Sequence, residues 1–136
     1  AAVLRIKLRQ LDNYIANRQK AASYYDEQLS TIEGISIPYR RTDSEHVFHQ
    51  YTLQLADGIN RDELIQFLKV KNIPAMVYYP VPAHQQKMFA CMEVTCSDMS
   101  NTEWLTSRVI SLPMHTELST EQQDSIINRI KEYFNK

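Results

Sequence analysis

The sequence predicts an α+β fold, in which a small and largely antiparallel sheet is covered by helices on one side. Three observations lead to this prediction. Apolar residues recur at helical spacing through residues 1–33, residues 46–55 alternate as a strand does, and further strand-like and helix-like segments follow with short links. The chain has 136 residues, which is the length of one domain.

One long helix is predicted over residues 1–33. Helices average about 11 residues, so a helix of this length is expected to reach beyond the domain, toward another part of the protein or a second subunit. Because the chain is already in helical register at Ala1, with no capping residue, we expect a fragment that starts inside the helix. Gly34 is the predicted stop, as the left-handed residue past the helix end. The apolar positions of this helix are spaced alternately by three and four, with one break where Arg18 or Gln19 would fall. They are Leu4, Leu8, Leu11, Ile15, Ala22, Tyr25, Leu29 and Ile32.

The clearest strand pattern lies in residues 46–55, where apolar and polar side chains alternate. Shorter strands are predicted over residues 35–38, 73–79 and 109–112, with Pro74 confined to the beginning of the second. In the main strand, the residues predicted to share the apolar face are Val47, His49, Tyr51, Leu53 and Leu55.

Capping signals define the remaining helices. Asn60 is expected to cap one, with Glu63 three residues later as its capping-box partner, and Asn72 tolerates the left-handed conformation that ends it. Ser119 opens the last helix, with Gln122 as its partner. A short helix is predicted over residues 102–108, and residues 83–100 are predicted to be mostly loop, with one helical turn near residues 87–91. Residues 34–136 would then form the domain proper.

Composition argues against several function classes. The formal net charge of −1 gives no bulk attraction to nucleic acid or to an anionic membrane. No apolar run approaches the ~20 residues that a membrane span needs. The two glycines, Gly34 and Gly58, are isolated, so no glycine-rich phosphate loop can form. We interpret Cys91 and Cys96 as two reduced cysteines of a cytoplasmic protein, in preference to a disulfide or half of a metal site.

Two histidines lie on the main predicted strand. His46 and His49 are three residues apart, so they point to opposite faces and are not expected to share a metal ion. A zinc site that adds Cys91 and Cys96 fits no standard spacing. His49 lies among apolar residues of the predicted strand. Two interpretations are possible: it is a hydrogen-bonded histidine of the core, or it contacts a ligand.

The most unusual stretch is YYPVPAHQQ, residues 78–86. Its two tyrosines are the last residues of the strand predicted over residues 73–79, in which neighbouring residues face opposite sides. One of Tyr78 and Tyr79 is therefore expected to pack while the other presents its hydroxyl. Two interpretations compete for the loop, which also holds His84. It is either a stiff exit from an edge strand or a preorganised wall of a binding cleft, because prolines lower the entropy cost of holding polar groups in place.

Four stretches, in their order and spacing, resemble the C-terminal part of the DegT/StrS family of pyridoxal-phosphate sugar aminotransferases, which have the aspartate-aminotransferase fold. The resemblance covers essentially the whole chain. It implies that residues 1–33 are the helix entering the family's small domain and that residues 34–136 are that domain. A large domain with the cofactor-binding residues and the Schiff-base lysine would precede them. The stretches are AAVLRIKLRQLDNYIANRQKAASYYDEQL, HVFHQYTLQL, NRDELIQFLKVKNIPAMVYYPVPAHQQKMF and VISLPMHTELSTEQQ.

The resemblance implies an activity for the full-length protein. It would transfer an amino group, usually from glutamate, to a keto sugar on a nucleotide, with pyridoxal phosphate as cofactor, as a cytoplasmic homodimer in polysaccharide biosynthesis. This chain alone would supply no catalytic, cofactor-binding or metal-binding residue, and it would be inactive. Its role would be to enclose and orient the substrate.

The loop of residues 78–86 resembles the family's His-Tyr-Pro segment at the mouth of the active site. This makes Tyr78, Tyr79, His84 and His49 the expected substrate-binding residues. Tyr78 departs from the histidine that is common at its position. A tyrosine exchanges hydrogen bonds but does not become a cation near neutral pH, so any charge toward the nucleotide's phosphates must come from elsewhere.

Two other interpretations stay open. Family members in which histidine replaces the lysine are sugar dehydratases, and others are regulatory. The deciding residue lies outside this chain. The third possibility is a non-enzymatic α+β module that binds a ligand or a partner.

Overall fold

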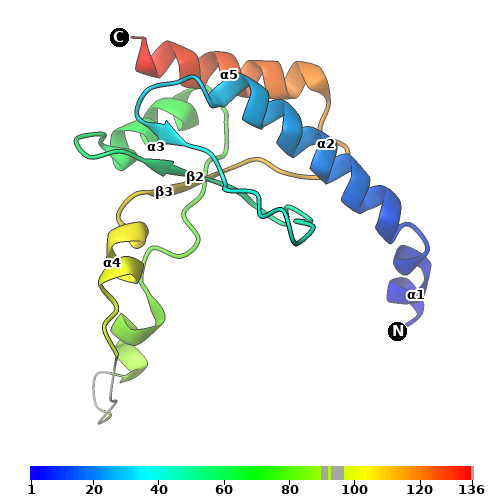
Figure 1. Cartoon of the computed structure of the whole chain (residues 1–136), viewed down its shortest axis with the longest axis horizontal. Coiled ribbons are helices and arrows are strands. Elements are labelled where there is room, and N and C mark those ends of the chain that lie inside the picture. Colours follow the sequence, from blue (N-terminus) through cyan, green and yellow to red (C-terminus); the bar gives the residue numbers. More distant parts are fainter. Residues whose placement is uncertain (90–91, 93–96, 136) are drawn as a thin grey trace.

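The computed structural model describes residues 1–89, 92 and 97–135. A three-stranded antiparallel sheet in the order β1-β2-β3 is covered on one side by α2, α3 and α5 (Figure 1), which confirms the predicted α+β architecture. The strands are β1 (Ile35–Ser36), β2 (Tyr51–Leu55) and β3 (Val109–Leu112). The helices are α1 (Ala2–Leu8), α2 (Leu11–Leu29), α3 (Arg61–Val70), α4 (Ser100–Thr106) and α5 (Thr120–Phe134), with short 3-10 helices η1 (Ala83–Gln85) and η2 (Lys87–Phe89).

The two faces of the sheet have different neighbours. Alternation along β2 buries Tyr51, Leu53 and Leu55 beneath the helices, each at most 1% exposed. On the other face, Thr52 pairs with Ser111 of β3, and their hydroxyl oxygens lie 2.8 Å apart. This second face therefore presents hydroxyl groups, and it lies on the side away from the core.

The core joins that apolar face to all three covering helices. Helix α2 contributes Tyr25 and Leu29, α3 contributes Leu64 and Leu68, and α5 contributes Ile126, Ile127 and Ile130. Burying a side chain of this size contributes about 1.5–3 kcal/mol to folding. These helices are consequently the rigid part of the molecule.

Capping accounts for where α3 and α5 begin. The Asn60 side chain accepts hydrogen bonds from the backbone N–H groups of Asp62 and Glu63. At α5 the full capping box is present, because the Ser119 hydroxyl accepts from the Gln122 N–H and the Gln122 amide accepts from the Ser119 N–H. After α3, Asn72 has a φ of 60°, the left-handed conformation expected of it.

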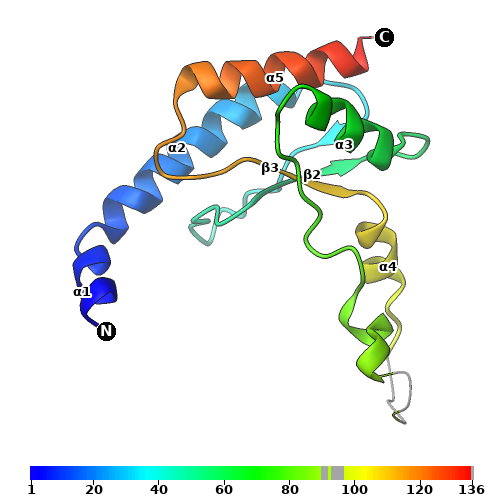
Figure 2. The same cartoon turned by 180° about the vertical axis from the view of Figure 1, so that it is seen from behind.

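The prediction of one helix over residues 1–33 was wrong in its bounds. Two helices occupy this region, since α1 ends at Leu8 and α2 begins at Leu11 and ends at Leu29. Helix α1 lies far from the sheet (Figures 1 and 2) and buries none of its residues. Its apolar side chains, Val3, Leu4, Ile6 and Leu8, are each between 64% and 67% exposed, so packing on the rest of the described structure contributes little to this helix. None of the described helices is long and apolar enough to cross a membrane.

Three predicted strands are shorter than their sequence patterns, and the one predicted over residues 35–38 is limited to Ile35–Ser36. Of residues 46–55, only Tyr51–Leu55 form a strand, because Phe48 adopts a φ of 48° that is incompatible with an extended chain. Phe48 turns into the core at 1% exposure, whereas Val47 and His49 are exposed. The predicted strand over residues 73–79 is reduced to a single bridge between Met76 and Ser111.

Residues 77–89 and 97–107, here called the lobe, project from the sheet on the side opposite α5 (Figures 1 and 2). The lobe contains η1, η2 and α4, the last of which begins and ends two residues earlier than predicted. Arg61 and Arg108 attach the lobe to the body. The Arg61 guanidinium donates to the Thr106 carbonyl, and that of Arg108 pairs with Asp57 and lies over the Trp104 ring.

Candidate functional site

A cleft of about 590 Å³ lies between the 78–86 loop and α4, over the hydroxyl-bearing face of the sheet. Thr52 and Val109 form its floor, because both point away from the core on neighbouring strands. Tyr78 and Tyr79 line the wall formed by the loop. The opposite wall is one face of α4, made by Thr102, Leu105 and Thr106.

The two tyrosines do not divide their roles as the sequence suggested. Neither belongs to a strand, so strand alternation does not apply, and the peptide bond between them is cis. Tyr78 is 41% and Tyr79 is 74% exposed, and their ring centroids lie 6.0 Å apart in an edge-to-face arrangement. Both rings line the cleft. The expectation that one of them packs into the core was wrong.

His49 lies in a second, smaller hollow beside the cleft. This hollow, of about 210 Å³, is lined by His49, Met76, Ser111 and also Tyr78. Tyr78 therefore stands between the two hollows and is common to both. The interpretation of His49 as a core histidine was wrong, because its side chain is exposed. The structure thus brings His49 and both tyrosines to one face of the molecule.

The His84 side chain does not line the cleft. Its Nε2 lies 2.9 Å from Oε1 of Glu103 on α4, and the Gln85 amide donates to the same oxygen at 2.9 Å. These hydrogen bonds, first that of His84 and then that of Gln85, lower the pKa of Glu103, so its carboxylate is held in the charged form. His84 therefore joins the loop to α4.

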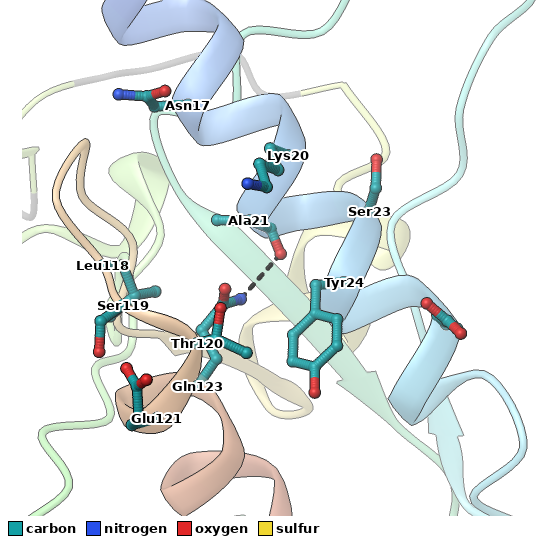
Figure 3. A pocket seen from close by; sticks show the side chains of 11 residues that line it. Asn17, Lys20, Ala21, Ser23, Tyr24, Leu118, Ser119, Thr120, Glu121 and Gln123 are labelled. Atoms are coloured by element: carbon teal, nitrogen blue, oxygen red, sulfur yellow. Dashed lines mark hydrogen bonds between the residues drawn. The ribbon is translucent and has the colours of Figure 1, made fainter.

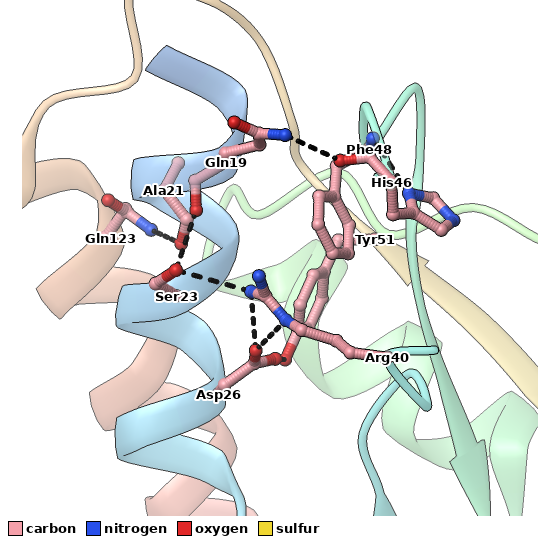
Figure 4. A network of polar contacts seen from close by, with 9 residues as sticks. All are labelled: Gln19, Ala21, Ser23, Asp26, Arg40, His46, Phe48, Tyr51 and Gln123. Carbon is pink, nitrogen blue, oxygen red and sulfur yellow. Dashed lines mark hydrogen bonds and ion pairs between the residues drawn. The ribbon is translucent and has the colours of Figure 1, made fainter. Parts of the chain in front are cut away.

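A polar network anchors the segment that carries His49 (Figure 4). Asp26 of α2 accepts from Arg40 Nε at 2.7 Å and from the Tyr51 hydroxyl at 2.7 Å. The Arg40 guanidinium also lies 4.6 Å from the centre of the Phe48 ring. Burial, and then the bond to Asp26, raises the pKa of Tyr51. Because these partners are separated by 14 and 25 residues, no local pattern in the sequence indicates the network.

A larger hollow of about 660 Å³ lies between α2 and the start of α5 (Figure 3). Several of the polar groups that line it have structural partners. Gln123 donates to the Ala21 carbonyl at 2.9 Å, and the Tyr24 hydroxyl donates to Asp124 at 2.5 Å, a bond that raises the pKa of Tyr24. Ser119 is occupied as the cap of α5. These bonds join two helices, so the candidate functional site is the cleft and not this hollow.

The cleft does not suit pyridoxal phosphate or a metal ion by itself. Neither a lysine for a Schiff base nor an arginine for a phosphate is among the described residues that line it. No three His, Cys, Asp or Glu side chains meet as metal ligands in the described part of the chain. Cys91 and Cys96, and the end of the predicted turn over residues 87–91, lie outside the described residues.

Comparison with known proteins decides the family. The sequence pattern of the DegT/DnrJ/EryC1/StrS aminotransferase family matches residues 1–131. The chain belongs to this family. A DegT/DnrJ/EryC1/StrS aminotransferase from Brucella abortus has the same fold, with a TM-score of 0.87 and 32% identity over 99% of this chain and 35% of that one. The crystal structure of S. venezuelae DesV superposes with a TM-score of 0.89 and 30% identity, over 99% of this chain and 36% of DesV.

Family members of known name include both enzymes and a regulator. The chain is 39% identical to the UDP-N-acetyl-3-dehydro-alpha-D-glucosamine 3-aminotransferase of Acidithiobacillus ferrooxidans, over 90% of this chain and 31% of the relative. It is 37% identical to a pleiotropic regulatory protein of Geobacillus stearothermophilus, over 98% of this chain and 36% of the relative. The chain therefore spans about a third of the length of the curated relatives it matches.

Proposed function

We propose that the full-length protein is a pyridoxal-phosphate-dependent aminotransferase that acts on a nucleotide-linked keto sugar, and that this chain is its substrate-enclosing small domain. The family membership supports the reaction class. The observation that carries the role of this chain is the cleft in which Tyr78 and Tyr79 face Thr52, Thr102 and Thr106. Five hydroxyl groups around one opening match a sugar, whose own hydroxyls both donate and accept hydrogen bonds.

The rest of the protein supplies what the cleft lacks. We place the cofactor and the Schiff-base lysine in the preceding large domain, so that residues 1–33 connect that domain to residues 34–136. When bound, pyridoxal phosphate supplies an electron sink for the transfer of the amino group. We further propose that glutamate is the amino donor and that the protein is a cytoplasmic homodimer.

The residues of this chain would orient the sugar. In the proposal, Tyr78 and Tyr79 exchange hydrogen bonds with sugar hydroxyls, and Tyr78 extends the contact toward His49 in the neighbouring hollow. His84 supports the loop from behind. Closing these groups around the sugar excludes water and fixes the keto carbon relative to the large domain, which is how positioning accelerates a reaction.

The test uses the full-length protein with glutamate and UDP- or dTDP-linked keto sugars. We expect 2-oxoglutarate and the corresponding amino sugar, identified by mass spectrometry. A hydrogen bond between neutral groups contributes about 0.5–1.5 kcal/mol, so Tyr78→Phe or Tyr79→Phe should lower kcat/KM about two- to tenfold. Tyr39→Phe is the matched control, because Tyr39 is 84% exposed and does not line the cleft.

A regulatory role is the second candidate, because the relative from Geobacillus stearothermophilus is named a pleiotropic regulatory protein. Absence of amino transfer from glutamate to every keto sugar tried, in a full-length protein that still binds pyridoxal phosphate, would favour this role. If transfer occurs and both tyrosine variants equal the parent, the cleft does not contact the sugar.

A further inference from the structure

The two walls of the cleft are joined by one carboxylate. Oε1 of Glu103 accepts a hydrogen bond from the Gln85 amide and is bonded to His84 Nε2, each at 2.9 Å. Among the described residues, these are the hydrogen bonds that connect the 78–89 segment directly to α4. The relative position of the walls therefore depends on Glu103 more than on any other polar group of the lobe.

The lobe has little apolar packing to replace this link. Of its described residues, only Pro82 is buried, and Leu105 on the cleft wall remains 39% exposed. A segment with so few buried contacts opens more easily than the body does. Two hydrogen bonds that meet at one Glu103 oxygen consequently have a larger share in setting the geometry of the lobe.

Glu103 itself does not line the cleft, although its helix neighbours Thr102 and Thr106 do. On the loop side, His84 and Gln85 also stay out of the lining, whereas Tyr78, Tyr79 and Gln86 belong to it. The link thus lies behind both walls, where it can act on the substrate only through the residues that it holds in place.

We propose that Glu103 is a positioning residue for the nucleotide sugar: by holding His84 and Gln85, it fixes the distance between the tyrosines of the loop and the threonines of α4. This inference rests on the proposed function of the cleft. Loss of the link lets the walls move apart, so the sugar must order them on binding. The loss is therefore expected in the affinity for the nucleotide sugar and not in the chemical step.

The experiment compares Glu103→Ala and Glu103→Gln in the full-length holoenzyme. Glu33→Ala is the matched control, because Glu33 is an exposed carboxylate in the turn after α2, away from the cleft. Loss of two exposed hydrogen bonds should raise the KM for the keto sugar about three- to tenfold. The kcat and the KM for glutamate should stay within about twofold. Glu103→Gln keeps an acceptor oxygen in the same place and should recover part of the loss.

A binding measurement separates this inference from the proposed function. Calorimetry with UDP-N-acetylglucosamine and dTDP-glucose, stable analogues of the keto sugars, needs no turnover. If Glu103→Ala weakens binding while the parent protein shows no transaminase activity, the proposed reaction is overturned and the positioning role stands. Transamination with an unchanged KM and unchanged binding in Glu103→Ala would overturn the positioning role. An equal rise in the KM for glutamate would also overturn it, because the effect would then be general.

Discussion

In the body of the molecule, α2, α3 and α5 bury Tyr25, Leu68 and Ile127 to 2% exposure or less against the apolar face of β2. In the lobe, Pro82 is the only buried residue among those that the structure describes. Both regions nevertheless contain one carboxylate with two partners. Asp26 joins Arg40 and Tyr51 beside the core, and Glu103 joins His84 and Gln85 near the surface.

The difference shows how the chain combines a rigid scaffold with an adjustable site. Binding residues are often placed on loops that a stable framework carries. Here the framework is the helix-covered sheet, and its outer face, with Thr52 and Val109, is the floor of the cleft. The lobe forms the walls of the cleft, and because it has few buried apolar contacts we expect these walls to move more easily than the body does.

The largest effect is expected from a matched pair of leucines. Leu68 is fully buried in the body, and Leu105 is 39% exposed on the cleft wall. Leu68→Ala should lower the free energy of unfolding by about 2–5 kcal/mol, because it leaves a cavity in a close-packed core. Leu105→Ala should cost less than about 1 kcal/mol. Urea unfolding of this chain measures both, and equal losses would mean that the lobe has a core of its own.

A smaller effect is expected from the buried polar network. Tyr51→Phe keeps the ring but removes the donor to Asp26, and a hydrogen bond to a charged group contributes about 1.5–3 kcal/mol. The pKa of Tyr51 is raised above its ordinary value of 10.0. The folded state therefore retains this proton at pH values where the unfolded state loses it, and stability falls as pH rises above about 10.

The same variant tests the sign of this pH dependence. Without the Tyr51 hydroxyl, the alkaline loss of stability should be shallower than in the parent, as followed by urea unfolding at a series of pH values. Tyr24, Tyr25 and Tyr133, whose pKa values are also raised, would contribute to what remains of the slope. An unchanged slope would show that Tyr51 does not contribute to it.

The smallest effect is expected from the exposed link in the lobe. The pKa of Glu103 is lowered from 4.5, chiefly by its hydrogen bond to His84. The negative charge of Asp98 acts in the other direction and raises this pKa. The support that the carboxylate gives to the loop is therefore present above pH 4.5 and is lost as pH falls through the lowered pKa. Nitrogen-15 relaxation should show residues 83–86 becoming more mobile as the pH falls below 4.5.

Glu103→Gln provides the comparison for that experiment. An amide does not titrate in this range, so the mobility of the loop should then be independent of pH. If the mobility of the loop changes with pH in the same way in the parent and the variant, another acidic group controls the loop. The comparison of Asp26 with Glu103 would then be wrong.

Local chemistry let the sequence by itself determine much of the fold. The Ser119 and Gln122 capping box and the Asn60 cap appear where they were predicted, because each depends on neighbours within a few residues. The strand over residues 109–112 also has its predicted bounds. The unusual composition of YYPVPAHQQ also led to the loop that forms one wall of the cleft. Its expected substrate contacts remain a prediction.

Only the tertiary structure decided the rest. Phe48 enters the core with a φ of 48°, where it meets Arg40 and Tyr51, and this contact ends a strand that alternation alone would have extended to residue 46. His84 has its partner 19 residues away, on α4. Asp26 and Tyr51 are 25 residues apart. Such pairings depend on how packed helices and strands place distant side chains, and a pattern with a period of two or 3.6 residues carries no information about them.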